Sequence, residues 1–374
     1  MNKSKILITG MSPALAGTET FIMTYYRNLD PEKFQVDFIV RTKDKIVFQD
    51  EILERGSKIY YLPRKRENYS EYRKSLEDFF NQHGKDYDAI WYNAMGIPNI
   101  DILEKAKSYG VKTRIIHSHS SSWKGNLASR IFHECNKLKL KNVATHYFAC
   151  SDLAAKYMFK PDILSKSTII KNAITIENFS FSNKAREQLR KDLGWQDCKI
   201  IGNIGRYDTQ KNQSFLIDVF NEALKQDDDL RLIIIGAEVG NNSTIKDIEE
   251  KVEQYGIRDK VLLPGTQYDI KKWLSAMDLF ILPSLFEGLP LSAVEAQANG
   301  LPIVVSDTIT KELDIFGKAT YLSLESPISE WVKAIEFSLR LPRTSDKEVK
   351  QIFKEKGFDI KSQVKEIENI LLGE

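Results

Sequence analysis

Residues 278–305 constrain the fold more than any other part of the chain, because they mark a strand, a helix and a second strand in turn. The apolar run 278–282 predicts a buried parallel strand, and residues 303–305 begin the next one. Between them, Pro290 fits the first position of a helix, where a missing N–H costs nothing. Gly300 fits the left-handed position just past the helix end. Such a strand–helix–strand unit is the repeating piece of an open α/β sheet.

The same alternation of short β-rich runs and helical stretches continues from end to end of the chain. It predicts an α/β protein built from parallel sheets. Because two such series follow one another in 374 residues, we expect two Rossmann-like domains facing each other across a cleft. The expected strands are 5–9, 36–40, 58–61, 89–92, 113–117, 145–149, 199–204, 230–235, 261–263, 279–282, 303–305 and 320–322, separated by helices such as 20–28, 69–82, 213–225 and 244–255.

Composition excludes several classes of protein. The formal charge of +2 gives no reason to expect nucleic acid as a partner. The three cysteines lack C-x-x-C spacing, which argues against a disulfide framework or a zinc site and fits a reducing cytoplasm. No apolar stretch approaches the roughly 20 residues of a membrane span, and the first apolar run is too short for a signal peptide. We therefore expect a cytoplasmic protein, soluble or peripheral at a membrane.

Two glutamates flank the strand-to-helix turn. Glu287 follows a strand and is expected in the loop at the carboxyl edge of a sheet, where open α/β folds bind ligands. Glu295 is expected about one and a half turns inside the helix, beside its apolar stripe. Burying a carboxylate without a polar partner is expensive, so a ligand rich in hydroxyl groups would suit this position.

The run Glu287-Gly288-Leu289-Pro290, followed by Glu295, resembles the signature of the retaining glycosyltransferases of family 4. The resemblance covers nearly the whole chain and is strongest over residues 199–307. It implies the GT-B fold and transfer of a sugar from a nucleotide-diphosphate donor, such as a UDP-sugar. Glu287, with the N–H groups of Gly288 and Leu289, would position the sugar and support charge at its anomeric carbon. Glu295 would accept hydrogen bonds from the ribose hydroxyls.

A cation pair precedes these glutamates in the chain. Gly205 and Arg206 end a predicted strand, and Lys211 opens the following helix. Two cations beside a helix N-terminus form a natural diphosphate site, because the helix dipole and free N–H groups add to the positive charge. Charge grows on the leaving diphosphate in the transition state, so Arg206 and Lys211 would act in catalysis as well as binding. Since Glu287 lies on a predicted loop and Lys211 at a helix start, we expect that replacing either one abolishes transfer and leaves folding intact.

The first half carries two further candidate segments. The loop before the first long helix resembles the family's glycine-rich loop, although Ala16 replaces one glycine and only Gly17 and Glu19 carry over. Glycine would let backbone N–H groups approach phosphate or acceptor closely. The family also places a histidine near the transferred sugar, and His119 is the better candidate because it lies farther past its strand. His117 is the alternative.

The resemblance also implies a division of labour between the domains. Residues 1–178 would bind the acceptor, a saccharide or lipid-linked saccharide of surface polysaccharide synthesis, and residues 185–350 would bind the donor. The last helices, about 355–374, would pack back on the first domain. No metal-carrying motif is evident, so we expect metal independence.

A basic stretch of the first domain adds an expectation about a surface. Residues 127–140 form a predicted amphipathic helix with Lys137 and Lys139, followed by Lys141. These lysines either form an ordinary solvated helix face or contact an anionic membrane, as the resemblance implies because acceptors in the family are often lipid carriers in the membrane. Two other readings of the whole chain remain: a nucleotide-sugar epimerase, and a non-catalytic partner subunit of a glycosyltransferase.

Overall fold

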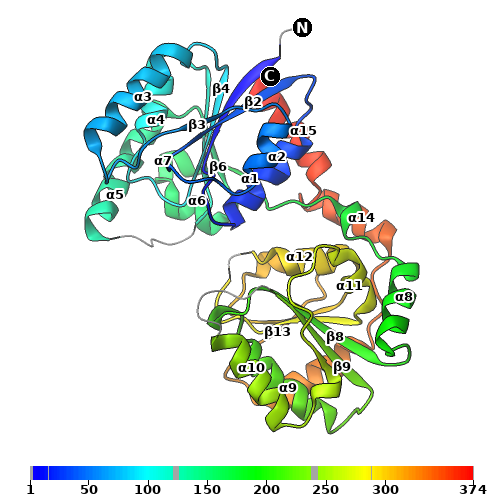
Figure 1. The fold of residues 1–374 in the computed structure, drawn as a ribbon. Helices are drawn as coiled ribbons and strands as arrows, with labels where there is room; N and C mark the ends of the chain where they lie inside the picture. Colours follow the sequence, from blue (N-terminus) through cyan, green and yellow to red (C-terminus); the bar gives the residue numbers. More distant parts are fainter. Residues whose placement is uncertain (1–2, 16, 121–125, 237–242, 288, 374) are drawn as a thin grey trace. The chain divides into compact units, whose positions relative to one another are not determined.

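The structure is a computed structural model that describes residues 3–15, 17–120, 126–236, 243–287 and 289–373. The chain forms two compact units, each built on its own sheet in Figure 1. The first comprises Met1–Ala173 together with Ile360–Glu374, and the second comprises Ile174–Asp359. Compared with the expected ranges, residues 174–178 and 355–359 belong to the second unit, and of the last helices only the final one joins the first unit.

The first unit is built on a seven-stranded parallel sheet with strand order β3-β2-β1-β4-β5-β6-β7. The order reverses between β1 and β4, which makes this the point where the loops at the carboxyl edge diverge and leave a crevice. Strand β7 was not expected, because two residues are too few to show a period. The strands are β1 (Ser4–Thr9), β2 (Phe34–Val40), β3 (Ile59–Tyr61), β4 (Ala89–Ala94), β5 (Thr113–Ser118), β6 (His146–Ala149) and β7 (Thr168–Ile169).

Helices cover both faces of this sheet, and each layer encloses its own apolar core. On one face, Phe21 and Tyr25 pack with the final helix through Val364 and Ile367. That face carries α1 (Gly17–Asn28), α2 (Gln49–Glu54) and α15 (Ile360–Leu372), which lie together in Figure 1. The other face carries α3 (Tyr69–His83), α4 (Asp101–Ser108), α5 (Leu127–Val143), α6 (Asp152–Met158) and α7 (Pro161–Leu164).

The second unit repeats this plan with a six-stranded parallel sheet of order β10-β9-β8-β11-β12-β13. Its switch point lies between β8 and β11. The strands are β8 (Lys199–Ile204), β9 (Leu230–Ile235), β10 (Val261–Leu262), β11 (Leu279–Leu282), β12 (Ile303–Ser306) and β13 (Thr320–Leu322). One face carries α8 (Asn183–Leu193), α11 (Ile270–Ala276), α12 (Leu291–Ala298) and α14 (Asp346–Glu355), and the other carries α9 (Gln213–Leu224), α10 (Ser243–Gln254) and α13 (Ile328–Leu339). Short 3₁₀ turns are η1 (Ile176–Asn178), η2 (Thr209–Lys211), η3 (Arg258–Lys260) and η4 (Lys311–Leu313).

Helix α12 shows how far the local sequence signals hold. Gly300 has φ +81° and so takes the expected left-handed conformation, and a Cβ atom there would lie 2.3 Å from the Thr344 carbonyl oxygen. Pro290 is the N-cap of α12 instead of its first helical residue, because its ψ of 113° is extended. The expectation for Pro290 is therefore wrong by one position, and the helix itself starts at Leu291.

Candidate functional site

The loops that follow β8 and β11 meet at the switch point of the second sheet. The backbone N–H of Leu285 donates to the Gln210 carbonyl at 2.8 Å, and the Gln210 side chain donates to the Phe286 carbonyl at 2.9 Å. These two bonds tie together segments that are far apart in sequence. They hold the residues around Lys211 against those around Glu287.

Lys211 and Glu287 form a salt bridge of 2.6 Å between Nζ and Oε1. Their side chains are only 12% and 11% exposed, and Oε1 also accepts from the Ser284 hydroxyl at 3.2 Å. Gly205 makes room for the lysine, since a Cβ atom there would lie 2.9 Å from Lys211 Cε. Removing one partner of a buried ion pair strands the other charge away from water. The burial of this pair argues against the expectation that either residue can be replaced without cost to folding.

Arg206 lies beside this pair but remains 55% exposed at its side chain. Its Nη2 atom is 3.1 Å from Asp208 Oδ2, while Asp208 Oδ1 accepts from the Lys211 backbone N–H at 3.0 Å. Asp208 is thus the N-cap of η2 and orients both cations, a role that our sequence analysis missed. An aspartate three residues before a turn-forming lysine is the signal that could have revealed it.

Glu295 lies in the second turn of α12 and is partly buried. Burial raises the pKa of its carboxyl to about 8. Within the described residues, neither a hydrogen bond nor an ion pair reaches this carboxyl group. Leu289 packs as a partly buried side chain on the core of the second unit. Gly288, like Ala16 of the first loop, lies outside the described residues.

The switch point of the first sheet brings together Gly10, Asn93 and His119. Gly10 has φ +111°, and a Cβ atom there would lie 2.7 Å from Asn93 Cβ, so the loop after β1 can pass this close to β4 only with glycine. The Asn93 amide donates from Nδ2 to the Thr9 carbonyl at 3.0 Å. That contact turns Asn93 Oδ1 toward His119 Nε2, which lies at 2.8 Å.

The hydrogen bonds assign the protons on both histidines. Because Asn93 Oδ1 can only accept, His119 carries its proton on Nε2, and its Nδ1 atom is able to accept a hydrogen bond. Burial lowers the pKa of His119 to about 3, so the ring is neutral. His117 accepts from the Trp91 indole N–H at 3.3 Å through Nδ1 and is fully buried, whereas His119 is partly exposed. Only His119 is placed to meet a ligand.

The first turn of α1, which follows the loop after β1, carries Gly17 and Glu19. Glu19 is buried, and its Oε1 atom accepts from the Ser12 hydroxyl at 2.6 Å. Its Oε2 atom is buried without a partner in the described part of the chain. Gly17 begins α1, and a Cβ atom there would meet nothing within 4 Å. The space above Gly17 is therefore open to a ligand.

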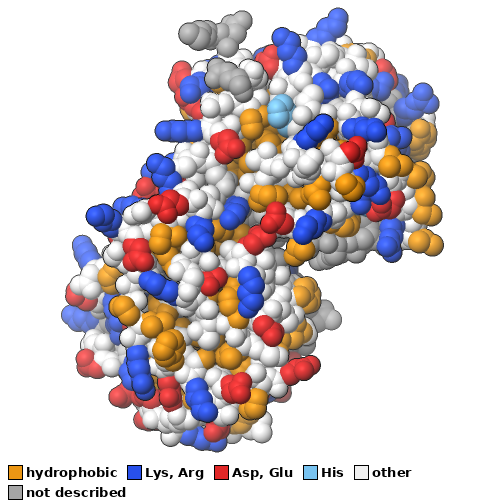
Figure 2. Space-filling model, turned by 180° about the vertical axis from the view of Figure 1, so that it is seen from behind, with side chains coloured by type: hydrophobic (Ala, Val, Ile, Leu, Met, Phe, Trp, Pro, Cys, Tyr) orange, Lys and Arg blue, Asp and Glu red, His pale blue; other side chains and the backbone are white. Residues whose placement is uncertain are grey.

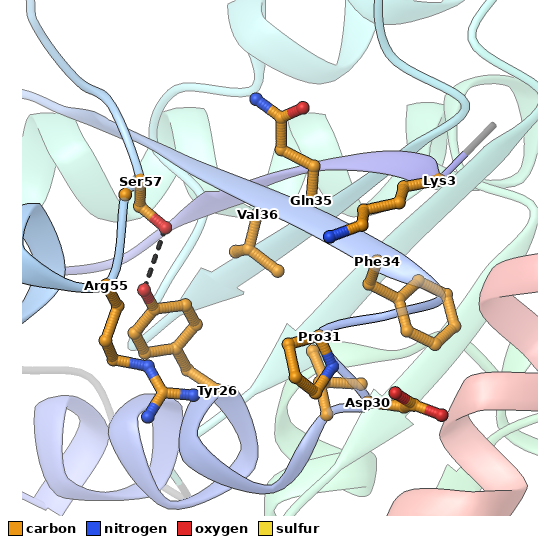
Figure 3. Close-up of a pocket in the computed structure, with 11 residues that line it drawn as sticks. Lys3, Tyr26, Asp30, Pro31, Phe34, Gln35, Val36, Arg55 and Ser57 are labelled. Atoms are coloured by element: carbon orange, nitrogen blue, oxygen red, sulfur yellow. Dashed lines mark hydrogen bonds between the residues drawn. The ribbon is translucent and has the colours of Figure 1, made fainter.

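A cavity of about 340 Å³ lies at the opposite, amino edge of the first sheet. In Figure 3 the Tyr26 hydroxyl points to Ser57, at 2.8 Å, and the Arg55 guanidinium lies over the Tyr26 ring, 4.8 Å from its centroid. Lys3 approaches from the start of β1. Because open α/β folds bind ligands at the carboxyl edge, we do not assign the site here.

Neither a metal site nor a membrane span emerges from the described residues. Across these residues, no three His, Cys, Asp or Glu side chains gather as metal ligands would. In the same part of the chain, every helix is too short or too polar to cross a membrane.

Comparison with known proteins agrees with this geometry. Residues 185–357, which fall within the second unit, match the family model of the glycosyl transferases group 1. The putative glycosyltransferase EpsF of Bacillus subtilis is 29% identical over 97% of this chain and 94% of its own length. The Escherichia coli UDP-Gal:alpha-D-GlcNAc-diphosphoundecaprenol alpha-1,3-galactosyltransferase is 24% identical over 82% of this chain and 80% of its own.

Solved structures agree on the fold. The Anabaena protein HepE, crystallised with UDP and glucose, superimposes with a TM-score of 0.75 at 16% identity, covering 99% of this chain and 100% of that one. The two parallel-sheet halves found here are those of the GT-B architecture. Residues 185–357 therefore form a domain similar to the group 1 glycosyltransferases, and the chain is an enzyme of the transferase class.

Proposed function

We propose that this enzyme moves a sugar from a UDP-sugar to a saccharide or lipid-linked saccharide, with retention of configuration, in the synthesis of a surface polysaccharide. The observation that carries the proposal is the Lys211–Glu287 pair, held at the carboxyl edge of the second sheet beside the exposed guanidinium of Arg206. Cations at this edge would neutralise the charge of a bound diphosphate, and a carboxylate held in one position would bind the hydroxyl groups of the sugar.

The donor-site roles follow from these positions. The Arg206 guanidinium, which is paired with Asp208 but 55% exposed, would bind phosphate oxygens with its remaining N–H groups, and Lys211 would supply a point charge. Among the described residues no side chain caps the N-terminus of α9, which begins two residues after Lys211 and adds its dipole to these cations. Glu295 offers an unpartnered carboxyl group to the ribose hydroxyls. Glu287, which retains Oε2 outside its salt bridge, holds the sugar.

The first unit would supply the acceptor site. His119 Nδ1 would accept a hydrogen bond from a sugar hydroxyl, and the open space above Gly17 would admit phosphate or acceptor. In the transfer, the bond from the anomeric carbon to the diphosphate oxygen breaks and the bond to the acceptor oxygen forms on the same face. The acceptor's proton goes to the departing diphosphate, so the step needs neither an enzyme nucleophile nor a metal ion.

The names of the relatives support the donor and acceptor classes. One relative is named for UDP-Gal and a diphosphoundecaprenol acceptor, and the Anabaena structure holds UDP. We propose by analogy a reaction at the cytoplasmic face of a membrane. The nucleotide-sugar epimerase and the non-catalytic subunit gain no support from any contact described above.

A donor panel tests the proposal. The purified protein is first screened by thermal shift with UDP-, GDP- and ADP-sugars, with and without EDTA. Sugar release is then measured with and without a lipid-linked acceptor, and the anomeric configuration of the product is read by NMR. We expect a UDP-sugar to stabilise the protein, and transfer to require acceptor and survive EDTA. Product without acceptor would indicate an epimerase, and binding without turnover would indicate a non-catalytic subunit.

A further inference from the structure

The cavity at the amino edge of the first sheet combines an apolar lining with two cations. Its volume of about 340 Å³ lies in the range of small-molecule sites. The buried side chains of Leu29, Phe34 and Val36 form the apolar part of the lining. In Figure 3 Lys3 approaches from one side of Val36, and Arg55 lies on the other side. A concave apolar surface flanked by positive charges suits an organic anion better than a neutral molecule.

Neither cation forms an ion pair in the described part of the chain. Glu51 lies one turn before Arg55, but its salt bridge, at 2.6 Å, is with Arg27. Asp30 is the one carboxylate among the residues that line the cavity, and its Oδ2 atom lies 3.8 Å from the Nζ atom of Lys33. The charges of both lining cations are therefore available to a bound anion.

Arg55 is held in place, and two hydroxyl groups lie beside it. Its guanidinium lies over the Tyr26 ring, 4.8 Å from the centroid, which favours one orientation of this long side chain. The Tyr26 and Ser57 hydroxyl oxygens are 2.8 Å apart, so one hydroxyl donates to the other. Two hydroxyl groups carry two protons, and the bond between them uses only one. The second O–H has no acceptor among the described residues, so it is available to an oxygen atom of a ligand.

The charge of the whole chain does not explain a preference for anions at this place. The formal net charge is only +2. On the face shown in Figure 2, Lys and Arg side chains are interspersed with Asp and Glu side chains. Long-range steering of an anion is therefore weak, and its affinity must come from contacts inside the cavity. Binding should then depend strongly on Arg55.

We propose that this cavity binds a small soluble organic phosphate, at a site separate from the donor site. The fork of Arg55 would bind two phosphate oxygens, and the second O–H of the Tyr26–Ser57 pair would donate to the third. A carboxylate has only two oxygens and would leave one of these donors unused. Lys3 would neutralise the remaining charge, while the organic part of the ligand lies on the apolar lining.

Occupancy of the cavity should stabilise the first unit. Tyr26 lies in the last turn of α1, and Leu29 follows that helix directly. The Asp30 N–H donates at 2.8 Å to Glu368 of α15, so the cavity also adjoins the helix that returns to this unit. A ligand that binds only the folded state stabilises it by mass action. A bound phosphate should therefore raise the Tm and slow amide exchange around the cavity.

Binding of phenyl phosphate to the full-length protein tests the proposal. Saturating UDP is added first, so that the probe reports on a site other than the donor site. We expect phenyl phosphate, but not phenol, to bind in titration calorimetry. Hydrogen–deuterium exchange should then show protection of residues 26–36 and 55–57. Arg55→Gln should weaken binding at least about tenfold, because the bidentate charged contact is lost. Arg66→Gln removes the same charge from an exposed arginine outside the cavity and is the matched control, which should bind like the wild type.

Three results would overturn the proposal. The first is the absence of binding at millimolar phenyl phosphate in the presence of UDP. The second is equal affinity of the wild type and Arg55→Gln, with thermal unfolding showing that the variant is folded. The third is protection of residues 205–211 in place of the cavity segments. If UDP itself fails to bind, the donor assignment fails, whereas the comparison of Arg55→Gln with Arg66→Gln still decides whether the cavity binds phosphate.

Discussion

At the scale of single residues, the Lys211–Glu287 pair decides what the second unit can do. The pair is nearly buried and spans 76 positions of sequence. The pair stabilises the fold and, on our proposal, also takes part in the reaction. A single substitution would therefore lower both stability and activity, and the two effects could not be told apart. Removing both charges together separates them, because no lone charge is then left in a poorly hydrated place.

We predict that Lys211→Met or Glu287→Gln alone costs about 3 kcal/mol of unfolding free energy, a fall in Tm of roughly 6–10 °C. The double variant should recover most of this loss. Transfer should remain lower by about 100-fold or more in all three proteins, because the charges that act on the reacting groups are missing. Thermal unfolding and kcat/KM are measured side by side. A double variant that regains full turnover would make the pair purely structural.

Asn93 is a positioning residue for His119, and its substitution should appear in a pH profile. In the wild type, burial keeps the pKa of His119 at about 3, so this group gives no pH dependence near neutrality. Asn93→Asp places a carboxylate against Nε2, which should raise the pKa of His119 above its wild-type value and add an acid limb to kcat/KM. Activity should then fall as pH drops through this raised pKa, because the imidazolium no longer offers Nδ1 as an acceptor.

Asn93→Ala is the control for this profile. It should lower activity by loosening the ring without creating the acid limb. If kcat/KM of the Asn93→Asp variant is lower than that of the wild type by the same factor at every pH, the residue does not act through the protonation state of His119.

Glu295 predicts a pH dependence for donor binding. Its raised pKa of about 8 means that the free protein holds the carboxyl protonated at neutral pH, whereas accepting from two ribose hydroxyls requires the ionised form. Binding should therefore release a proton, and affinity for UDP-glucose should rise by up to about tenfold per pH unit as pH increases toward 8. Titration calorimetry in buffers of different ionisation enthalpy measures both effects. Glu295→Gln should bind more weakly and independently of pH; a flat wild-type profile would contradict the assignment.

The sequence pointed to Glu287, Glu295 and Lys211 because each belongs to a local pattern of strand end, cap and helix turn. It could not show that Lys211 and Glu287 touch, since that contact depends on how two distant loops are tied by Gln210. Asn93 carries no local pattern at all. Its role arises only because β1, β4 and β5 end side by side.

At the scale of elements, hydrophobic periodicity predicted where strands and helices lie along the chain. It predicted less well which face of each element packs against the rest of the protein. The expected strands 230–235 and 279–282 have the same bounds in the structure. Periodicity did not show which face of α5 is buried, because Lys137 reaches across to Tyr157 while apolar Leu138 faces solvent. The elements that pack against a helix decide which of its faces is buried, and the sequence does not show which elements these are.

The end of α12 gives a prediction at this scale. Gly300 and Gly317 both have positive φ, of 81° and 70°, but a Cβ atom on Gly300 would clash with the Thr344 carbonyl at 2.3 Å whereas one on Gly317 would meet nothing. Alanine at position 317 should cost about 1 kcal/mol from backbone strain alone. Alanine at position 300 should cost at least about 3 kcal/mol, since the chain that passes α12 must also move. Urea unfolding measures the free energy of unfolding of both alanine variants. Equal losses would mean that the close packing of Gly300 against Thr344 does not contribute to the cost.

At the scale of the whole molecule, the chain leaves its first unit at Ala173 and returns to it at Ile360. Composition indicated two domains because of chain length, but the place of return could not be derived from the local pattern. Residues 346–355 and 360–372 are both amphipathic helices, and only tertiary packing shows that α14 joins the second unit while α15 joins the first.

This return makes the stability of the first unit depend on the last residues of the chain. Ile367 is fully buried against α1, so Ile367→Ala should cost about 2–4 kcal/mol and open the first unit to proteolysis. Ile335→Ala, at 1% exposure in the second unit, is the matched substitution. Limited proteolysis with mass spectrometry should place early cuts in residues 1–173 for the first variant and in 174–359 for the second. We assign UDP-glucose binding to the second unit, so binding should be retained in Ile367→Ala. In Ile335→Ala, added UDP-glucose should slow proteolysis of the second unit, because a ligand that binds only the folded state stabilises it. Cuts in the same unit for both variants would show that the two units do not unfold separately.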